Sequence, residues 1–321
     1  MSATTPDLRI RLFGRLLGMS GLTSPDTMSR RQIALSRALP IPHGPGLDLV
    51  VGGLGSGVRM EQRQVTVRDG DRIGVRVYRS SASGMLPLVV NFHGGGWVLG
   101  SLAMAESVCS RLAAALPAVV ASVDYRLAPE HRFPTALHDA YDATVWAHAN
   151  ADEFGADASR LAVMGDSAGG NLAAGVALLA RGNGPRIGAQ ELLYPALDLT
   201  LGSPSMAENA HAPVLTRSHM RAYRDHYLGP RGDPEDPLAS PLLADDLSGL
   251  PPALIQTAQF DPLRDDGARY AARLVDAGVP VSHTCLDGTA HGFATFPGVF
   301  RRAPQAFEQL VGHLREHLEQ V

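Results

Sequence analysis

From Leu161 to Ala180 the chain reads LAVMGDSAGGNLAAGVALLA. The apolar run Leu161 to Met164 is typical of a strand buried on both faces, and the run from Asn171 to Arg181 is typical of a helix. Between them, Gly165-Asp166-Ser167-Ala168-Gly169 places a serine in a turn with glycine two residues before it and two after. A turn this sharp leaves no room for bulky neighbours. The stretch therefore predicts a strand, a tight turn and a helix, with Ser167 at the helix N-terminus.

Short apolar runs alternate with helical segments over most of the chain. We expect strands buried on both faces at residues 88–92, 119–123, 161–164, 187–193, 253–257 and 281–286, and helices near residues 103–116, 135–150, 168–181, 264–277 and 303–319. Strand then helix, repeated, predicts an α/β fold with a mostly parallel central sheet and helices on both faces. An antiparallel hairpin of residues 62–67 and 73–78 precedes these elements, with Asp69-Gly70-Asp71 as its turn.

Two stretches do not follow this rhythm. Residues 1–50 are predicted to form an N-terminal helical segment and linker: Leu8 to Leu17 has helical spacing, and a second helix is expected after the start signal Ser24-Pro25-Asp26. The linker begins in the glycine- and proline-rich stretch from Pro40 to Gly57. Residues 58–321 are expected to be the α/β domain, with an insertion near residues 200–230 that contains a helix at 217–228.

Composition excludes several classes of function. Apolar residues make up 45% and charged residues 19%, as in a soluble globular protein, and a net charge of −4 gives no reason to expect nucleic acid or an anionic membrane as a partner. No apolar run is long enough to span a membrane, and the N-terminus lacks the apolar stretch of a signal peptide. We therefore expect a cytoplasmic protein without stable membrane insertion.

The chain contains no lysine, so all 28 basic residues are arginines. This excludes Schiff-base and pyridoxal-phosphate enzymes, and also the phosphate-binding Gly-Lys-Ser/Thr loop. Cys109 and Cys285 do not make a disulfide framework, and no paired Cys or His spacing indicates a metal site. We expect no cofactor and no metal.

Ser167 is the strongest candidate for a chemical role. Backbone N–H groups and the dipole at a helix N-terminus stabilise developing negative charge. A bare Gly-x-Ser-x-Gly pattern also occurs in ordinary loops, but here it stands between a strand and a helix, which is the context of a nucleophile elbow. We expect Ser167 to be a nucleophile.

Three glycines follow the strand at residues 88–92, in the sequence His93-Gly94-Gly95-Gly96-Trp97. Consecutive glycines let several N–H groups point to one place, which stabilises the negative oxygen formed during acyl transfer. The alternatives are a flexible turn and a phosphate-binding loop, and the second would need a lysine or a Gly-x-Gly-x-x-Gly pattern. The sequence thus predicts an oxyanion hole in this loop.

A general base and its acid partner are expected in later loops. His291 lies between glycines just past the strand at residues 281–286, at a carboxyl end where catalytic groups gather in α/β sheets. Asp261 follows the strand at 253–257; as an aspartate before proline it is also a good helix N-cap, and the two roles are compatible. Asp265 and Asp266 are the alternatives. The order Ser167, Asp261, His291 differs from that of trypsin and subtilisin and resembles the order of the triad in the α/β-hydrolase topology.

Five motifs together resemble the hormone-sensitive-lipase-like esterases of the α/β-hydrolase fold, in particular the bacterial branch with a Gly-Asp-Ser-Ala-Gly-Gly elbow, over roughly residues 86–320. The motifs are His93-Gly94-Gly95-Gly96-Trp97, Asp124-Tyr125-Arg126-Leu127-Ala128-Pro129-Glu130-His131, the elbow, Asp261-Pro262-Leu263-Arg264-Asp265 and His291-Gly292-Phe293. The resemblance implies oxyanion donors at Gly95, Gly96 and Ala168, and a helical cap built from the N-terminal helices and the insertion. It places His93 in the motif but outside the triad. Arg126 and Glu130 look like a buried polar network at the sheet edge.

The resemblance also implies esters of short or medium acyl chains as substrates. We therefore expect a serine carboxylesterase that acts on a small-molecule ester, with a homodimer as an assembly that the sequence allows. An amidase or formamidase with the same triad is the main alternative. A ligand receptor that has lost catalysis is disfavoured because all three triad residues are present, and an interfacial lipase is disfavoured because no long apolar lid is evident.

Overall fold

The computed structural model describes residues 5–20, 24–39, 43–44 and 46–319. At its centre lies an eight-stranded sheet with the order β1-β2-β4-β3-β5-β6-β7-β8. The strands are β1 (Val58–Thr66), β2 (Arg72–Ser80), β3 (Leu86–Phe92), β4 (Val119–Asp124), β5 (Ala156–Asp166), β6 (Ala189–Leu193), β7 (Ala253–Phe260) and β8 (Val281–Ala290). The pairs β1–β2 and β2–β4 are antiparallel and all other pairs are parallel, so the prediction of a mostly parallel sheet is confirmed.

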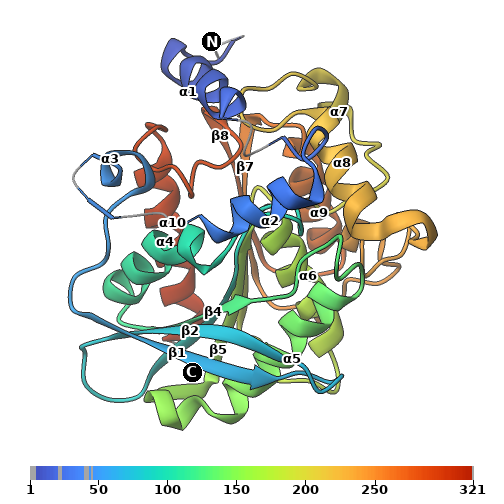
Figure 1. Ribbon diagram of the computed structural model, residues 1–321. Helices are drawn as coiled ribbons and strands as arrows, with labels where there is room; N and C mark the ends of the chain where they lie inside the picture. Colours follow the sequence, from blue (N-terminus) through green and yellow to red (C-terminus); the bar gives the residue numbers. More distant parts are fainter. Residues whose placement is uncertain (1–4, 21–23, 40–42, 45, 320–321) are drawn as a thin grey trace.

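Helices cover both faces of this sheet (Figure 1). On one face lie α4 (Leu102–Ala115) and α10 (Ala303–Leu318), and on the other lie α5 (Thr135–Ala149), α6 (Ala168–Ala180) and α9 (Arg264–Asp276). Outside these layers are α1 (Leu8–Met19), α2 (Arg30–Ala38), α3 (Asp48–Val51), α7 (Pro204–Glu208) and α8 (Arg217–Leu228). In the described part of the chain there are also short 3-10 helices at Ala151–Phe154, Gly229–Arg231 and Pro241–Leu243.

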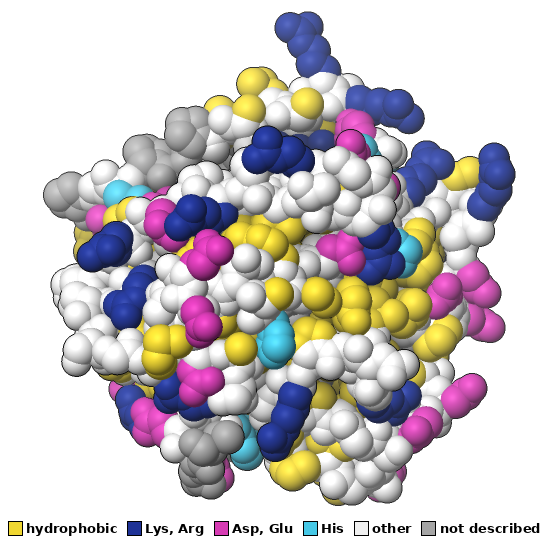
Figure 2. Space-filling model, turned by 90° about the horizontal axis from the view of Figure 1, so that it is seen from below, with side chains coloured by type: hydrophobic (Ala, Val, Ile, Leu, Met, Phe, Trp, Pro, Cys, Tyr) yellow, Lys and Arg dark blue, Asp and Glu magenta, His cyan; other side chains and the backbone are white. Residues whose placement is uncertain are grey.

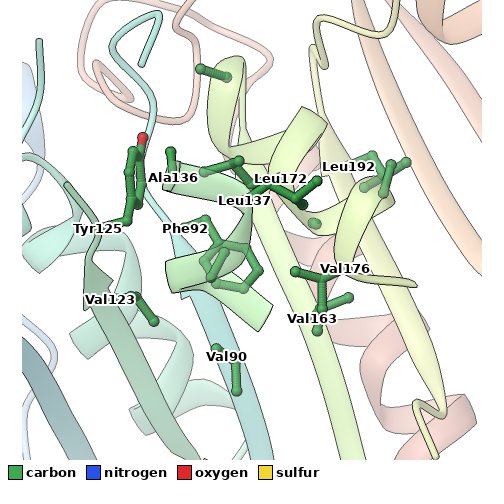
Figure 3. Packing of buried hydrophobic residues seen from close by; sticks show 14 of the residues in the cluster. Val90, Phe92, Val123, Tyr125, Ala136, Leu137, Val163, Leu172, Val176 and Leu192 are labelled. Atoms are coloured by element: carbon green, nitrogen blue, oxygen red, sulfur yellow. The ribbon is translucent and has the colours of Figure 1, made fainter. Parts of the chain in front are cut away.

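The core is divided between the two faces because successive side chains of a strand point to opposite sides. All seven residues of β3 are buried. Val90 and Phe92 pack with α5 and α6, as Figure 3 shows beside Leu137 and Leu172, whereas Val89 belongs to the cluster that α4 and α10 make on the other face. Because both faces of β3 are buried, its sequence is almost entirely apolar, with Asn91 as the polar exception.

Most predicted elements are confirmed within a few residues, and the helix at residues 217–228 is confirmed at both ends. The prediction of a strand buried on both faces is wrong for β8. This strand pairs only with β7, and Ser282, His283 and Cys285 are exposed, because an edge strand has no neighbour on its other side. The free thiol of Cys285 is on this edge, and that of Cys109 is buried.

The N-terminal region also differs in detail from the prediction. The second helix starts at Arg30, and its cap is Ser29, which forms a reciprocal capping box with Gln32. The expected start signal at Ser24 to Asp26 instead forms a turn. The expected linker contains the short helix α3, while residues 40–42 and 45 of that stretch lie outside the described residues. Among the described helices, none is long and apolar enough to span a membrane.

Candidate active site

Ser167 lies between β5 and α6 in a strained turn. Its φ of 56° and ψ of −117° fall outside the regions that side-chain-bearing residues prefer. Strain of this kind persists only where surrounding structure holds it. Here a Cβ atom at Gly165 would collide with the backbone of Gly169, and one at Gly169 would collide with the carbonyl oxygen of Phe92. The two glycines thus allow the start of α6 to approach β5 and β3 closely, which holds Ser167 in this turn.

Three side chains from separate parts of the chain meet at this turn. His291 Nε2 lies 2.9 Å from Ser167 Oγ, and His291 Nδ1 lies 2.7 Å from Asp261 Oδ2. Asp261 is fully buried, while Ser167 and His291 are 9% and 8% exposed. The structure therefore brings together all three residues expected from the sequence. A neutral imidazole in this position can accept the serine proton, and the carboxylate can hold Nδ1 protonated.

The carboxyl ends of β7 and β8 position the acid and the imidazole. Asp261 follows β7 directly, and its Oδ1 accepts a hydrogen bond of 2.9 Å from the backbone N–H of Leu263. The expectation that Asp261 is a helix N-cap is wrong, since Leu263 holds the cap position of α9. In this contact the aspartate side chain accepts a hydrogen bond from the backbone two residues further on, as in an Asx turn. The other carboxylate oxygen, Oδ2, can therefore accept a hydrogen bond from His291 Nδ1. His291 follows β8, and Gly292 after it has a φ of 82°, which favours glycine.

The two alternative aspartates contact other groups. Asp265 Oδ2 accepts the backbone N–H of Ser205 at 2.8 Å. Asp266 accepts the backbone N–H groups of Leu197 and Asp198 and the hydroxyl of Ser203. Neither carboxylate contacts the imidazole, so the geometry singles out Asp261. Burial raises the pKa of Asp266 to about 7.

The glycine loop lies beside Ser167. Gly95 and Gly96 have φ values of 120° and 62°, and a Cβ atom at Gly96 would collide with the ring of Tyr223. Within the described residues, the backbone N–H groups of Gly95, Gly96 and Ala168 donate to no protein acceptor. Ala168 is the first residue of α6, where N–H groups have no partner inside the helix. These three donors are therefore available to an oxygen bound at Ser167.

Buried polar contacts fix the rest of the glycine loop. The N–H of Gly94 donates to Asp166 Oδ1 at 2.8 Å, and His93 stacks on Tyr125 with ring centroids 4.4 Å apart. The hydroxyl of Tyr125 donates to the carbonyl of His93 at 2.6 Å. Burial raises the pKa of Asp166 and lowers the pKa of His93. Trp97, fully buried, stacks on a tyrosine of α8 at 4.5 Å.

Arg126 and Glu130 belong to two different networks, so the expectation of a single buried one is wrong. The guanidinium of Arg126 donates to the fully buried carboxylate of Asp139. Glu130 has a side chain 44% exposed and pairs with Arg37 of α2 at 2.9 Å. Arg37 also donates to the carbonyl of Val98 at 2.7 Å and to that of Ala128, which ties α2 to the loop after the three glycines.

A cavity of about 490 Å³ opens onto Ser167 and His291. Its walls come from α1, α2, α3, α4 and α8 and from the loops that follow β3 and β8. Apolar side chains dominate the lining: Leu17, Leu39, Leu47, Val51, Leu99, Met104, Val214, Leu215 and Phe296. Volume and lining are those of a site for a small organic ligand.

Sequence reasoning missed residues that complete the site. The ring of Tyr194 meets that of His291 edge-on at 4.7 Å, and its hydroxyl donates to Asp166 at 3.3 Å. Its place immediately after β6, at a strand's carboxyl end, is the signal that could have indicated it. His43 and His219 also line the cavity and carry no local motif. In the described part of the chain, no group of three or more potential ligand side chains is arranged to hold a metal ion.

Comparison with known proteins assigns the family. A profile of the alpha/beta hydrolase fold matches residues 89–295, which is more than half of the chain. The chain belongs to the α/β-hydrolase fold family. It is 41% identical to the carboxylic ester hydrolase LipN of Mycobacterium tuberculosis, over 98% of this chain and 84% of that protein. It is 44% identical to the carboxylesterase NlhH of the same species, over 78% of this chain and 80% of that protein.

A solved structure agrees with these relatives. This α/β-hydrolase superimposes on the hyperthermophilic esterase of the archaeon Pyrobaculum calidifontis with a TM-score of 0.83 and 38% identity, over 98% of this chain and 99% of that one. The resemblance to hormone-sensitive-lipase-like esterases and the expected α/β-hydrolase fold are thereby confirmed.

Proposed function

We propose that this α/β-hydrolase cleaves carboxylic esters of short to medium acyl chains through an acyl-enzyme on Ser167. The observation that carries the proposal is the pair of hydrogen bonds, 2.7 and 2.9 Å long, that links Asp261 through His291 to Ser167. The names of the relatives, carboxylic ester hydrolase and carboxylesterase, support the substrate class.

The first half of the reaction forms the acyl-enzyme. His291 Nε2 removes the proton from Ser167 Oγ as that oxygen attacks the ester carbonyl, and Asp261 stabilises the imidazolium that results. The carbonyl oxygen becomes negative and accepts hydrogen bonds from Gly95, Gly96 and Ala168. In comparable enzymes, one such donor contributes about 10² to 10³ in turnover. The alcohol then leaves with the proton from His291.

The second half returns the enzyme to its starting state. Water gives its proton to His291 and attacks the acyl carbon, the same N–H groups stabilise the second oxyanion, and Ser167 regains its proton as the acid leaves. No cofactor and no metal takes part in this scheme.

The residues around the triad have supporting roles in this proposal. Gly165 and Gly169 permit the elbow, and Asp166 orients the glycine loop through the N–H of Gly94. His93 and Trp97 hold the two ends of that loop by stacking on tyrosines, outside the reacting groups.

The helices outside the sheet layers form a cap over the pocket in this proposal. Its N-terminal part is the segment of residues 1–50, and its second part is the insertion near residues 200–230 of the catalytic domain, residues 58–321. Leu17 of α1, Leu39 and Tyr223 line the same cavity as Ser167, which supports this division. A cavity of about 490 Å³ accommodates an acyl chain of medium length together with its alcohol.

A panel of p-nitrophenyl esters from acetate to palmitate, with one p-nitroanilide, tests the function. We expect the highest kcat/KM at short or medium chain length, a steep fall towards palmitate, and little cleavage of the anilide. Faster cleavage of the anilide would favour the amidase alternative. A maximum at palmitate would favour a lipase. Inactivity on every ester would favour a ligand receptor that has lost catalysis.

Location and assembly remain sequence-based predictions. We predict a cytoplasmic location, and a homodimer is an assembly that the sequence allows. Light scattering after size-exclusion chromatography measures the oligomeric state.

A further inference from the structure

Helix α1 has two faces of opposite character. Its inner face packs on the protein: Ile10 is 2% exposed, the ring of Phe13 lies 5.0 Å from that of Phe296, and Gly14 lies against the backbone of Pro213. A Cβ atom at Gly14 would collide with Pro213, so the helix sits close to the body of the molecule.

The outer face of α1 is also apolar. Leu8, Leu12, Leu16 and Met19 are 62%, 48%, 67% and 83% exposed. They recur every three or four residues, so they form one stripe along the helix, opposite the packed face. Single exposed apolar side chains are ordinary, whereas a contiguous exposed stripe indicates a surface that binds something.

Arginines flank this stripe on both sides. At 3.6 residues per turn, Arg9 falls on one flank and Arg11 and Arg15 fall on the other. Arg9 donates to the carbonyl of Gly298. Arg11 and Arg15 are exposed, and neither forms an ion pair with any residue that the structure describes.

Basic residues outnumber acidic residues near the N-terminus, although the net charge of the whole chain is −4. The first 38 residues contain six arginines against two aspartates, whereas the other 283 contain 22 arginines against 30 acidic residues. Figure 1 shows α1 at the upper edge of the molecule, and Figure 2 shows the view from below, where basic and acidic side chains are interspersed. The net charge of −4 therefore does not disfavour an anionic partner for α1.

We propose that the outer face of α1 docks on an anionic lipid surface. An apolar stripe bordered by cations is the pattern of a helix that lies in the plane of a membrane interface. The leucines enter the boundary between headgroups and acyl chains, while the arginines reach the headgroup phosphates with their alkyl stems along the apolar layer.

A second copy of this chain is a poorer partner for the same stripe. Two copies of α1 placed face to face would bring four arginines together, two of Arg11 and two of Arg15. Within the described part of α1 and its N-cap, Asp7 is the acidic residue of each copy. Like charges across an interface are unfavourable. An anionic surface supplies the opposite charge.

Docking would also bring the pocket towards the lipid. Leu17, next to Leu16 in α1, lines the cavity of Ser167. The outer-face residues Leu8, Leu12, Leu16 and Met19 do not line it, so the proposed binding is separate from the proposed catalysis and can be measured without it.

Sedimentation with lipid vesicles tests the proposal. The probes are vesicles of phosphatidylcholine alone and of equal parts phosphatidylcholine and phosphatidylglycerol. We expect binding to the second kind that weakens as salt is added, since salt screens charge. The variant Arg11→Gln/Arg15→Gln should bind about 25-fold more weakly, because each basic residue near an anionic surface contributes roughly fivefold. Leu12→Ser/Leu16→Ser should lose more than about tenfold.

The control variant is Met85→Ser/Val275→Ser, which removes two exposed apolar side chains, 47% and 58% exposed, far from α1 in sequence. It should bind like the unaltered chain, and all variants should keep p-nitrophenyl acetate hydrolysis. Equal binding of the unaltered chain to both kinds of vesicle, or binding that neither α1 variant weakens, would overturn the proposal. So would an α1 variant that changes the oligomeric state in light scattering, with vesicle binding unaltered, because the partner would then be a second copy.

Discussion

Each oxygen of Asp261 has a separate partner: Oδ1 accepts from the backbone of Leu263, and Oδ2 contacts His291. Replacing Asp261 with Asn should lower kcat by about 10⁴, since an amide favours the wrong tautomer and cannot stabilise the imidazolium. Asp265→Asn is the matched control, because Asp265 contacts Ser205 and Arg264 instead. The measurement is kcat on p-nitrophenyl acetate with circular dichroism to verify folding. Comparable losses in both variants would show that the acid has been wrongly chosen.

Asp266 is a second buried carboxyl, and it affects how stability depends on pH. Burial raises its pKa to about 7, well above that of an aspartate in an unfolded chain. The folded state therefore binds the proton of Asp266 more tightly than the unfolded chain does. The contribution of this proton to the free energy of unfolding is complete below about pH 4 and is lost as pH rises to about 7. Asn resembles the protonated carboxyl, so Asp266→Asn should remove this dependence.

Urea unfolding at pH 5 and pH 7.5 measures the effect. Relative to Asp266→Asn, the unaltered chain should lose free energy of unfolding between the two values, by at most about 4 kcal/mol over the full range. A difference between the two proteins that does not vary with pH would refute a protonated Asp266.

At the scale of elements, Arg37 is the main polar link between α2 and the glycine loop. Replacing Arg37 with Met keeps the alkyl stem but removes the bonds to Val98, Ala128 and Glu130. We expect the melting temperature to fall by several degrees, at about 2 to 4 °C per kcal/mol. The KM for medium-chain esters should rise more than the KM for acetate, because α2 lines the pocket.

The control for this variant is Arg31→Met on the same helix, since the side chain of Arg31 is exposed and forms no hydrogen bond or ion pair within the described residues. Thermal unfolding and chain-length profiles of both variants check the prediction. If Arg37→Met keeps the profile of the unaltered chain, α2 does not shape the acyl pocket.

The elements were predictable where the local pattern is unambiguous. Continuous apolar runs indicated the buried strands, and glycines on both sides of Ser167 indicated the elbow. Whether β8 lies at the edge of the sheet depends on which strands pair with it. The residues of β8 do not encode that pairing. The start of α2 was misplaced because Ser24-Pro25-Asp26 and the capping box of Ser29 and Gln32 are competing local signals.

Long-range contacts were the least predictable part of the site. Asp261 and His291 could be chosen because parallel strands bring their carboxyl ends to one edge. Tyr194 was missed although it has the same kind of position, since no catalytic motif surrounds it. Arg37 meets Ala128, 91 residues away, and nothing local predicts a contact across that separation.

In the whole molecule, the order of the strands in the sheet brings the reacting groups together. Strands β5, β7 and β8 deliver Ser167, Asp261 and His291 to one edge, and β3 delivers the glycine loop. The N-terminal helices close the pocket above that edge in the proposed division, and the apolar outer face of α1, flanked by Arg11 and Arg15, is turned outwards. One chain thus combines a mostly parallel sheet, which aligns the reacting groups, with an N-terminal segment in which arginines outnumber acidic residues.

Covalent labelling tests directly whether Ser167 is the nucleophile. A p-nitrophenyl phosphonate reacts with an activated serine and stays attached, so mass spectrometry of the intact chain counts the labels and peptide mapping places them. We predict one label per chain, on Ser167, with loss of esterase activity in proportion, and no label on Ser167→Ala, whose turnover should be about 10⁴ to 10⁶ lower. Equal labelling of Ser167→Ala, or a label mapped to another residue in the inactivated enzyme, would contradict the assignment of Ser167 as the nucleophile.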